Sequence, residues 1–479
     1  MLALGKKVMV VSSWAPPMVG GPQNLYNLFS QFTPDSYCIL TRHETVLQRE
    51  VTGSKLSGKY FFCDAPSENQ RSLIMSFHVQ KGTAEIDRMR RRVPAIADNP
   101  FIKNSVTATA KMVRMGVRIV REKGIEFILG ISDEGPALIS SYLISRITGV
   151  PYALWLFDIY RGNNLTPVSK LLAMIFERRL VENASVVIVT NECTRNFYRN
   201  RYGSDLRCAV VHNSIFPSDY EATRTPYAPR EPYTVVFTGN LFWPQERSLF
   251  NLINALDRLR DLPIRLDLYI PNASASLRKR LSARSNIRLM AAPQSEMPGI
   301  QCKSTILFIP LSWHTRAPEV IATATPGKLA DYLASGRPIL VHAPPYACLS
   351  KYARENAFAL VVDEENSEKL QEGIRRLVFD LKYSCQLIEN AKRTLYAKHD
   401  AYFNAKKLAG IIGSVSRSAS KTTACGHDED SATSPPGLKQ RIDCLVALAV
   451  GYSLSSVGEL AKKTSHRMLA QSNTSPREP

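Results

Sequence analysis

The sequence has no apolar run long enough to cross a membrane. The longest such run near the end of the chain, residues 444–450, is well short of the roughly 20 residues that a transmembrane helix requires. The apolar stretch before Lys6 and Lys7 is also too short for a signal peptide. We therefore expect a cytoplasmic protein, with attachment at the inner face of the cytoplasmic membrane as the alternative.

Cysteine spacings typical of metal or redox sites are absent too. The nine cysteines are scattered along the chain, without a Cys-x-x-Cys pair and without a His/Cys metal-ligand spacing. We therefore expect reduced, structural thiols and no metal site.

Acidic residues are scarce relative to basic ones. The chain has 42 Asp and Glu against 61 Lys and Arg, and its formal net charge is +19. Such a balance implies an acidic partner: a nucleic acid, an anionic membrane surface or a phosphorylated substrate. Basic residues gather at 87–93 and on a helix expected over 111–123. These clusters lack interleaved aromatic residues, so we expect no nucleic acid, and a peripheral contact with an anionic membrane stays open.

Strand-like and helix-like segments alternate along most of the chain. Runs of β-branched residues, for example at 7–12 and 185–190, are typical of buried parallel strands, and amphipathic segments follow them. This alternation predicts an α/β fold with parallel sheets. A chain of 479 residues is too long for one ordinary core and suggests two domains.

Composition also divides the chain. Residues 224–232 contain three prolines and read as a linker. Residues 1–223 are then the first domain and residues 233–413 the second. Residues 414–479 are rich in Ser, Thr, Ala, Lys and Pro, and we expect a low-complexity tail that is partly disordered.

Residues 323–338, Thr-Ala-Thr-Pro-Gly-Lys-Leu-Ala-Asp-Tyr-Leu-Ala-Ser-Gly-Arg-Pro, carry the most specific signal. They predict a loop and a short helix, with Thr325 as N-cap, Pro326 at the first helical position and Gly336 closing the helix. Lys328 then adds a cation to the positive end of the helix dipole, a placement that favours a bound anion such as a phosphate. A solvated lysine on a surface helix is the alternative.

This segment resembles the donor site of GT-B glycosyltransferases, in the family called glycosyltransferase family 4 or glycosyl transferases group 1. The resemblance covers about residues 7–412. It implies two Rossmann-like domains facing across a cleft, the first binding the acceptor and the second the nucleotide-sugar donor. It also implies that Asp331, in place of the family's usual glutamate, binds the donor ribose hydroxyls. The family's other glutamate corresponds to Thr323, and Glu319 is the only acid nearby.

The resemblance implies a second donor contact at Gly239, which ends an expected strand and whose backbone would approach the donor phosphates. Many members of the family place an Arg and a Lys after this glycine. Here Arg247 is the only early cation. We therefore assign most of the phosphate charge to Lys328, with Arg247 as the weaker candidate.

The loop after the first strand contains Gly20 and Gly21, and Asn24 follows in a helix. This strand, loop and helix arrangement is typical of the sheet edge where ligands bind. The two glycines are adjacent, so the loop is not the Gly-x-Gly-x-x-Gly dinucleotide fingerprint, and a plain turn is the alternative. The resemblance implies that Gly20, Gly21 and Asn24 bind the acceptor.

Asp158 ends another expected strand at the same kind of edge. It would be a general base toward the acceptor hydroxyl if the reaction inverts the sugar's configuration, or a sugar contact if it retains it. A carboxylate that caps the following turn is the alternative.

We thus expect a hexosyltransferase-like enzyme of cell-surface polysaccharide biosynthesis. It would move a sugar from a UDP- or GDP-linked donor to a hydroxyl of a glycan or lipid-linked acceptor. No other cofactor and no metal are expected, because Lys328 and the helix end can stabilise the leaving diphosphate. A sugar-nucleotide epimerase of the same fold, or a non-catalytic protein that binds membrane or nucleic acid, are the alternatives.

Overall fold

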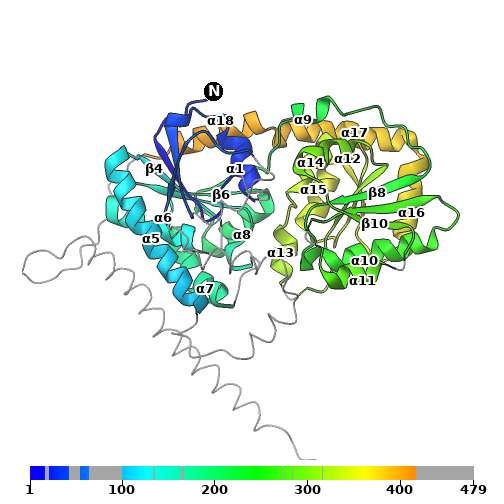
Figure 1. The fold of residues 1–479 in the computed structure, drawn as a ribbon, viewed down its shortest axis with the longest axis horizontal. Helices are drawn as coiled ribbons and strands as arrows, with labels where there is room; N and C mark the ends of the chain where they lie inside the picture. Colours follow the sequence, from blue (N-terminus) through cyan, green and yellow to red (C-terminus); the bar gives the residue numbers. More distant parts are fainter. Residues whose placement is uncertain are drawn as a thin grey trace, which may run out of the picture.

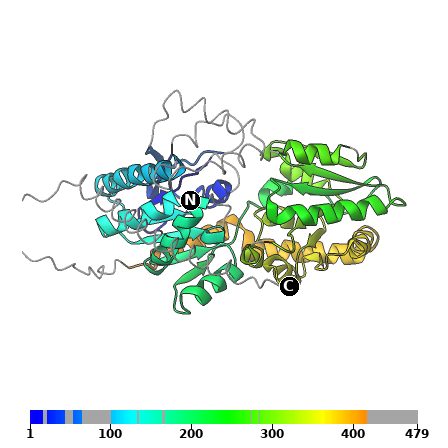
Figure 2. The same ribbon diagram turned by 90° about the horizontal axis from the view of Figure 1, so that it is seen from below.

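The computed structural model describes residues 1–16, 21–42, 54–63, 100–132, 135–162, 167–271, 273–282, 284–315 and 317–416. Over these ranges the chain forms two α/β domains that lie side by side, as Figure 1 and Figure 2 show. The basic cluster at 87–93, Gly20 and the expected disordered tail beyond residue 416 lie outside the described residues. No helix in these ranges is both long and apolar enough to span a membrane.

The first domain is built on a seven-stranded sheet with the order β3-β2-β1-β4-β5-β6-β7. All of its strand pairings are parallel. The order reverses between β1 and β4, which is the point where open α/β sheets bind ligands at their carboxyl edge. The strands are β1 (Val8–Val11), β2 (Tyr37–Thr41), β3 (Lys59–Phe62), β4 (Phe127–Ile131), β5 (Tyr152–Leu156), β6 (Val186–Val189) and β7 (Cys208–Val210).

Helices cover both faces of this sheet, because the side chains of a strand alternate between its two faces. Val8 and Val10 belong to the core shared with α1, whereas Met9 and Val11 belong to the core under α5 and α6. The helices of this domain are α1 (Gly21–Phe29), η1 (Pro34–Ser36), α5 (Pro100–Lys123), α6 (Pro136–Thr148), η3 (Tyr160–Gly162), α7 (Pro167–Glu182) and α8 (Glu192–Tyr202).

The second domain repeats the plan with a six-stranded sheet of order β10-β9-β8-β11-β12-β13. Its pairings are also parallel. The strands are β8 (Tyr233–Thr238), β9 (Ile264–Tyr269), β10 (Ile287–Met290), β11 (Ile306–Pro310), β12 (Ile339–His342) and β13 (Ala359–Val362). The order reverses between β8 and β11, so the end of β8, next to Gly239, lies at the corresponding switch point.

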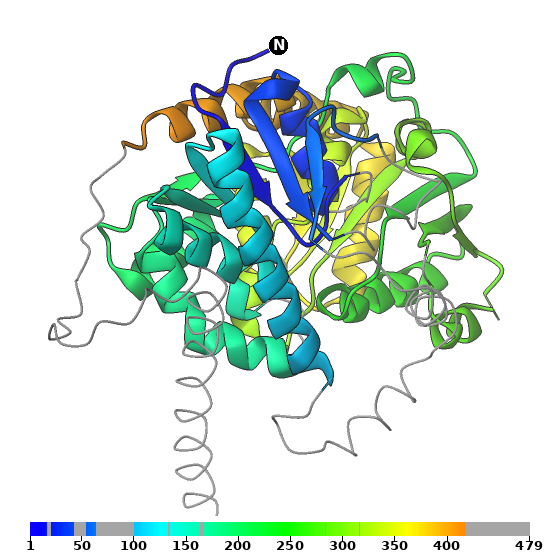
Figure 3. The ribbon, with the colours of Figure 1, turned by 60° about the vertical axis from the view of Figure 1, so that its left-hand side comes forward.

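The remaining helices surround this sheet and connect it to the first domain. They are α9 (Ser218–Glu221), α10 (Trp243–Arg258), α11 (Ala275–Leu281), η4 (Gln294–Glu296), α12 (Met297–Cys302), α13 (Pro318–Thr323), α14 (Lys328–Ala334), α15 (Cys348–Asn356), α16 (Ser367–Phe379), α17 (Leu381–Thr394), the π-helix η5 (Leu395–His399) and α18 (Ala401–Gly413). The last of them, α18, returns to the first domain and packs beside α1 (Figure 3).

Several contacts join the two domains. The start of the connecting segment is held by Arg337, whose guanidinium is buried and donates to the carbonyl and the hydroxyl of Thr225 at 3.0 and 2.7 Å. Helix α13 lies between the domains in Figure 1, and Val320 packs on the core of the first domain.

A disulfide joins the domains as well. It links Cys193 in α8 to Cys348 at the start of α15. The prediction of reduced thiols is therefore wrong for this pair, because the fold brings together two cysteines that are 155 residues apart. Cys38, Cys208, Cys302 and Cys385 carry free thiols.

A buried carboxylate supports the turn that follows Asp158. The side chain of Glu177 is fully buried and accepts hydrogen bonds from the hydroxyls of Tyr202 at 2.6 Å and Tyr198 at 3.3 Å. It also accepts from the backbone N–H of Arg161, at 3.2 Å, and lies 3.5 Å from the Arg161 Nε. Because so many donors converge on one carboxylate, its removal would leave several of them without a partner.

We expect Glu177→Ala to lower the free energy of unfolding by about 3 kcal/mol, the order expected when one partner of a buried ionic cluster is removed. The matched control is Glu182→Ala, one turn further along α7. Glu182 pairs at the surface with Arg178, so this change should cost about 0.5 kcal/mol or less. Urea unfolding followed by tryptophan fluorescence measures both values, and equal losses in the two variants would contradict the assigned role of Glu177.

Candidate active site

The helix that carries Lys328 begins later than the sequence predicts. The predictions that Thr325 is its N-cap and Pro326 its first residue are wrong, because α14 starts at Lys328 and Gly327 occupies the cap position. The Thr325 hydroxyl instead accepts a hydrogen bond from Asn191 Nδ2, in the first domain, at 2.9 Å. The end of the helix is as expected, with Gly336 just after the C-cap at a φ of +70°.

Lys328 is the central cation of the site. Its Nζ is buried, lies 3.4 Å from the ring centroid of Phe237 and has no hydrogen-bond acceptor among the residues that the structure describes. Burial lowers the pKa of Lys328 well below its usual value, and the charge of Asp331 offsets only part of this effect. A buried ammonium without an acceptor is costly, so this position favours the arrival of an anion.

Gly239 lies directly beside this ammonium. A Cβ atom added to Gly239 would be 3.8 Å from Lys328 Nζ, and the φ of Gly239 is +94°, a conformation that other residues rarely adopt. The sequence prediction that Gly239 and Lys328 share one site is therefore consistent with their positions. Together they place a cation next to a stretch of backbone that a ligand can approach closely, because Gly239 has no side chain.

Asp331 lies one turn further along α14 and contacts a residue that the sequence did not suggest. The hydroxyl of Tyr220 lies 2.8 Å from Asp331 Oδ1 and 2.8 Å from Gln301 Oε1. Burial raises the pKa of Asp331 to about 6, although the bond to Tyr220 acts in the opposite direction. The carboxyl is thus held in one orientation and titrates near neutral pH.

Tyr332 fixes α14 to the switch point of the sheet. Its buried hydroxyl accepts a hydrogen bond from the backbone N–H of Thr238, at 2.9 Å, and lies 3.2 Å from the Thr238 hydroxyl. Since Thr238 ends β8 immediately before Gly239, this contact sets the distance between the glycine and the helix that carries Lys328.

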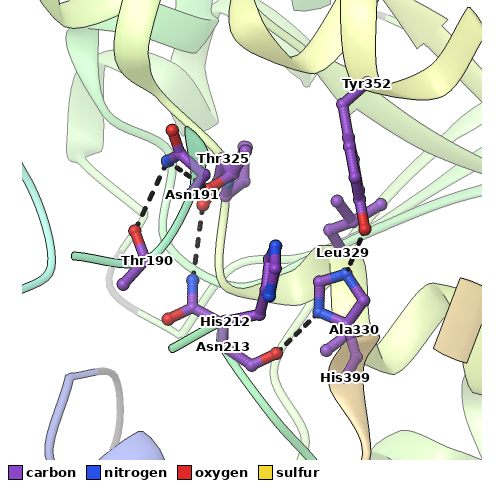
Figure 4. Close-up of a pocket in the computed structure, with 10 residues that line it drawn as sticks. Thr190, Asn191, His212, Asn213, Thr325, Leu329, Ala330, Tyr352 and His399 are labelled. Carbon is purple, nitrogen blue, oxygen red and sulfur yellow. Dashed lines mark hydrogen bonds between the residues drawn. The ribbon is translucent and has the colours of Figure 1, made fainter. Parts of the chain in front are cut away.

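The loop before α14 is bound by asparagines of the first domain (Figure 4). Asn191 Nδ2 donates to the Thr323 carbonyl and to the Thr325 hydroxyl, both at 2.9 Å. Asn213 Nδ2 donates to the Thr325 carbonyl at 3.4 Å, and Asn213 Oδ1 accepts from Asn24 at 2.9 Å. The position of the Lys328 segment therefore depends on side chains of the other domain.

Two histidines extend this contact between the domains. The His399 Nδ1 lies 2.7 Å from the carbonyl of Asn213, so this nitrogen carries the proton and the other one accepts from the Tyr352 hydroxyl at 2.9 Å. Burial, together with the charge of nearby His212, lowers the pKa of His399 to about 3. The space between these side chains is about 10 Å³, enough for a single water-sized molecule. The histidine contact is a packed junction and not a substrate pocket.

Asp158 follows β5 at the carboxyl edge of the first sheet. Its side chain is exposed to solvent, yet the surrounding protein raises the pKa of its carboxyl through desolvation. The preceding residue, Phe157, accepts a hydrogen bond through its carbonyl from Thr190, which adjoins Asn191. This places Asp158 near the junction of the two domains.

The fold has been solved many times in proteins whose sequences differ strongly from this one. No protein-family model matches the chain, and neither does any curated protein sequence. Sucrose-phosphate synthase from Thermosynechococcus elongatus is 12% identical over 84% of this chain and 97% of its own, with a TM-score of 0.60. Anabaena HepE in complex with UDP-glucose is 13% identical over 85% and 100%, with a TM-score of 0.57. The α,α-trehalose 6-phosphate synthase of Burkholderia multivorans is 13% identical over 88% and 100%, with a TM-score of 0.59.

The fold is that of the GT-B glycosyltransferases. The predicted fold class, two Rossmann-like domains that face each other, is thus confirmed. In this GT-B arrangement the carboxyl edges of both sheets carry the candidate residues: Asp158 follows β5, Asn191 follows β6, and Gly239 follows β8. The structural similarity establishes the GT-B fold, whereas identities this low say nothing of the roles of individual residues.

Two of the predicted donor contacts, Arg247 and Glu319, have other partners in the structure. Arg247 forms a two-pronged ion pair with Glu365, the second contact being 2.9 Å long, so its charge is already balanced. The side chain of Glu319 is exposed on α13, and the hydrogen bond of this residue uses its backbone carbonyl, which accepts from the Thr323 hydroxyl. The structure therefore groups Gly239, Lys328 and Asp331 but adds neither of these side chains to that group.

Two of the predicted acceptor residues, Gly21 and Asn24, have different surroundings. Gly21 starts α1, and a Cβ there would be 3.0 Å from the ring of Phe157, so the glycine lets α1 begin against the residue next to Asp158. Asn24 instead uses its amide to bind Asn213 and the backbone N–H of Ser214. Its contacts order the domain junction rather than present a free group to an acceptor.

Sequence reasoning missed Asn191 and Tyr220. Asn191 had an available signal, because an asparagine between a strand and a helix is a preferred N-cap, and its Oδ1 accepts from Thr194 N–H at 2.8 Å. Tyr220 had none, since its contact with Asp331 joins residues 111 positions apart.

The pKa of Asp331 generates a prediction about pH. Between the usual value of 3.8 and about 6, the folded carboxyl keeps a proton that the unfolded chain releases, so stability falls as the pH rises through this window. Asp331→Asn keeps an acceptor for Tyr220 but cannot ionise. We expect the free energy of unfolding of Asp331→Asn, minus that of wild type, to increase by roughly 2 to 3 kcal/mol from about pH 4 to about pH 7. Urea unfolding at several pH values measures this, and parallel curves would contradict the shift.

Proposed function

We propose that this protein is a glycosyltransferase that uses a nucleoside-diphosphate sugar. The observation that carries the proposal is the ammonium of Lys328, buried over Phe237 beside the open backbone of Gly239 and without an acceptor among the described residues. A diphosphate supplies the anion that this arrangement requires. The solved complex of the similarly folded HepE with UDP-glucose supports a nucleotide sugar, with UDP- or GDP-linked donors as the candidates.

In this proposal Lys328 acts on the leaving group. When the bond between the sugar C1 and the diphosphate oxygen breaks, negative charge grows on that oxygen, and a fixed cation in a low-dielectric site stabilises it. The lysine needs no reorganisation, because Tyr332 and Phe237 already hold α14 and its side chain in place. Since this cation replaces a metal ion, we propose transfer without a metal requirement.

Asp158 is proposed to act at the acceptor. The hydroxyl oxygen forms the new bond to C1 and its proton must leave; a carboxylate of raised pKa is better suited to take it than an ordinary one. This role belongs to an inverting reaction, and a contact to the sugar is the role in a retaining one. Either way the products are the glycosylated acceptor, a nucleoside diphosphate and one proton.

Asp331 is proposed to bind the ribose hydroxyls of the donor, and Tyr220 orients its carboxyl.

The charge of the chain bears on the acceptor. A basic chain that carries exposed Lys111, Arg114 and Arg118 on α5 is suited to an acceptor at an anionic surface. We therefore propose hexosyl transfer to a glycan or lipid-linked acceptor in polysaccharide biosynthesis.

The role of Lys328 is tested by Lys328→Met, which replaces the ammonium with an apolar side chain that can still pack on Phe237. We expect the ligand-free variant to melt roughly 2 °C or more above wild type, because a buried unpaired charge is removed. We also expect the variant to lose the thermal shift that UDP-, GDP-, ADP- or CMP-sugars give wild type. Lys351→Met, at an exposed position on α15, is the matched control and should change neither value.

Two results would contradict this role. A persisting ligand shift in Lys328→Met would show that the lysine does not bind the donor. A lower melting temperature of the ligand-free variant would show that the ammonium is stabilised within the protein and needs no anion.

The role of Asp158 is tested by turnover with the donor that gives the shift. We expect Asp158→Asn to lower kcat by about 10²-fold or more in EDTA-containing buffer, as for loss of a general base. Asp205→Asn, at an exposed position after α8, should leave kcat unchanged. The anomeric configuration of the product separates a base from a sugar contact. Conversion of the nucleotide sugar without an acceptor would instead favour the epimerase.

A further inference from the structure

The disulfide between Cys193 and Cys348 lies where the two domains meet. Cys193 belongs to the first turn of α8, in the first domain, and Cys348 is the first residue of α15, in the second. Their Cα atoms are 6.0 Å apart, inside the range that a disulfide bridges without moving the backbone. The bond therefore joins two domains that otherwise associate through non-covalent contacts and the chain itself.

We propose that Cys193 and Cys348 are a site of reversible oxidation that switches this domain junction between a covalently closed and a dithiol form. The co-reactant is a small-molecule disulfide such as glutathione disulfide. The proposal rests on the fold and on the contacts of α8, and it stands or falls independently of the proposed glycosyl transfer.

The contacts around the bond suit both states. Cys348 Sγ lies 3.5 Å from Asn191 Oδ1, which can accept from the thiol after reduction. Asn191 Oδ1 also accepts from the N–H of Thr194 at the start of α8. Reduction thus leaves the buried sulfur of Cys348 with a polar partner, and the dithiol form is compatible with the same fold.

Near the disulfide, α8 and residues 323–325 are also joined by neutral hydrogen bonds. Asn191 donates to the Thr323 carbonyl and the Thr325 hydroxyl, and the Thr194 hydroxyl donates to the Thr323 carbonyl at 3.2 Å. Each such bond has a modest net strength, because water can replace either partner when the domains separate. Contacts between domains of this kind permit relative motion, whereas a covalent bond at the same place does not.

The chemistry is a balanced thiol–disulfide exchange that begins at Cys193. Cys193 is partly exposed, whereas Cys348 is 3% exposed, so an external reagent reaches Cys193 first. The Cys193 thiolate attacks glutathione disulfide, forms a mixed disulfide and releases one glutathione thiolate. The Cys348 thiolate then attacks the Cys193 sulfur and releases the second. Two protein thiols are oxidised to one disulfide, one glutathione disulfide is reduced to two thiols, and the two protons of the protein thiols pass through solvent to the released glutathione thiolates.

The bond controls a segment that leads to Lys328. Oxidation holds α8 against α15, and α8 holds residues 323–325, which precede α14. In the dithiol form this segment keeps only non-covalent contacts, namely the asparagine and threonine hydrogen bonds and the packing of Val320 on the first domain. We therefore expect the closed form to protect residues 318–325 and the start of α8 from local opening.

The first experiment maps the bond in the full chain. Purified protein is equilibrated in glutathione buffers from reducing to oxidising, alkylated and digested with trypsin. Cys193 and Cys348 then lie in separate peptides, residues 180–195 and 329–351, each with one cysteine. We expect these peptides linked under oxidation, separate under reduction and linked again on return. Cys193→Ser should abolish the linked species, and Cys385→Ser, at an exposed free cysteine on α17, should not.

The second experiment measures the junction itself by amide hydrogen exchange of the same samples. Residues 318–325 and 192–198 should exchange roughly tenfold more slowly in oxidised wild type than in reduced wild type. Cys193→Ser and Cys348→Ser should match reduced wild type in both buffers. The wild-type comparison needs no variant, so a variant that fails to fold leaves the test intact.

Three results would overturn the proposal. Failure of the linked peptides to form would mean that the pair does not oxidise. A bond that native protein keeps at about 10 mM reduced glutathione would be a permanent structural link. A reversible bond with equal exchange in both states would mean that the junction does not respond to it. None of these readouts depends on a sugar donor or on turnover.

Discussion

The buried ammonium of Lys328 is the constraint on which the arrangement of the second domain depends. Its Nζ lies over Phe237 without an acceptor among the described residues, and burial lowers its pKa. Protein interiors rarely leave a charge in this state, and such exceptions concentrate at sites where a ligand completes the set of partners. Two neighbours act on this ammonium. Gly239 leaves room beside it, and Tyr332 holds the helix that carries Lys328 against the end of β8.

Both domains contribute to the site, although Lys328 itself lies in the second domain. The loop before α14 is bound by Asn191 and Asn213 of the first domain, and the Cys193–Cys348 disulfide closes on the same place. A change in how the domains meet is therefore transmitted directly to the segment that carries Lys328. This coupling needs no long pathway through the core, because the junction and the lysine are only a few residues apart in the chain.

Local patterns predicted the regular parts of the fold well. The helix expected after the strand at 185–190 is α8, Glu192–Tyr202. The expected alternation of buried strands with amphipathic helices is present in both domains. Patterns failed where a tertiary partner outweighed a local preference. Thr325 is a good N-cap by type, yet its hydroxyl binds Asn191 and the helix starts later. Strand β3 also escaped prediction, because residues 41–100 show no steady period.

The sequence by itself determined the α/β class, the short helix that carries both Lys328 and Asp331, and the strongly positive net charge. Each follows from short-range spacing or from composition, which do not depend on long-range contacts. The grouping of Gly239 with these two residues came from the family resemblance. The tertiary structure alone decided that Arg247 pairs with Glu365, that Tyr220 orients Asp331 and that Cys193 meets Cys348. These pairs join residues more than 100 positions apart, and only the packing of the two domains selects which of the many chemically suitable partners meet.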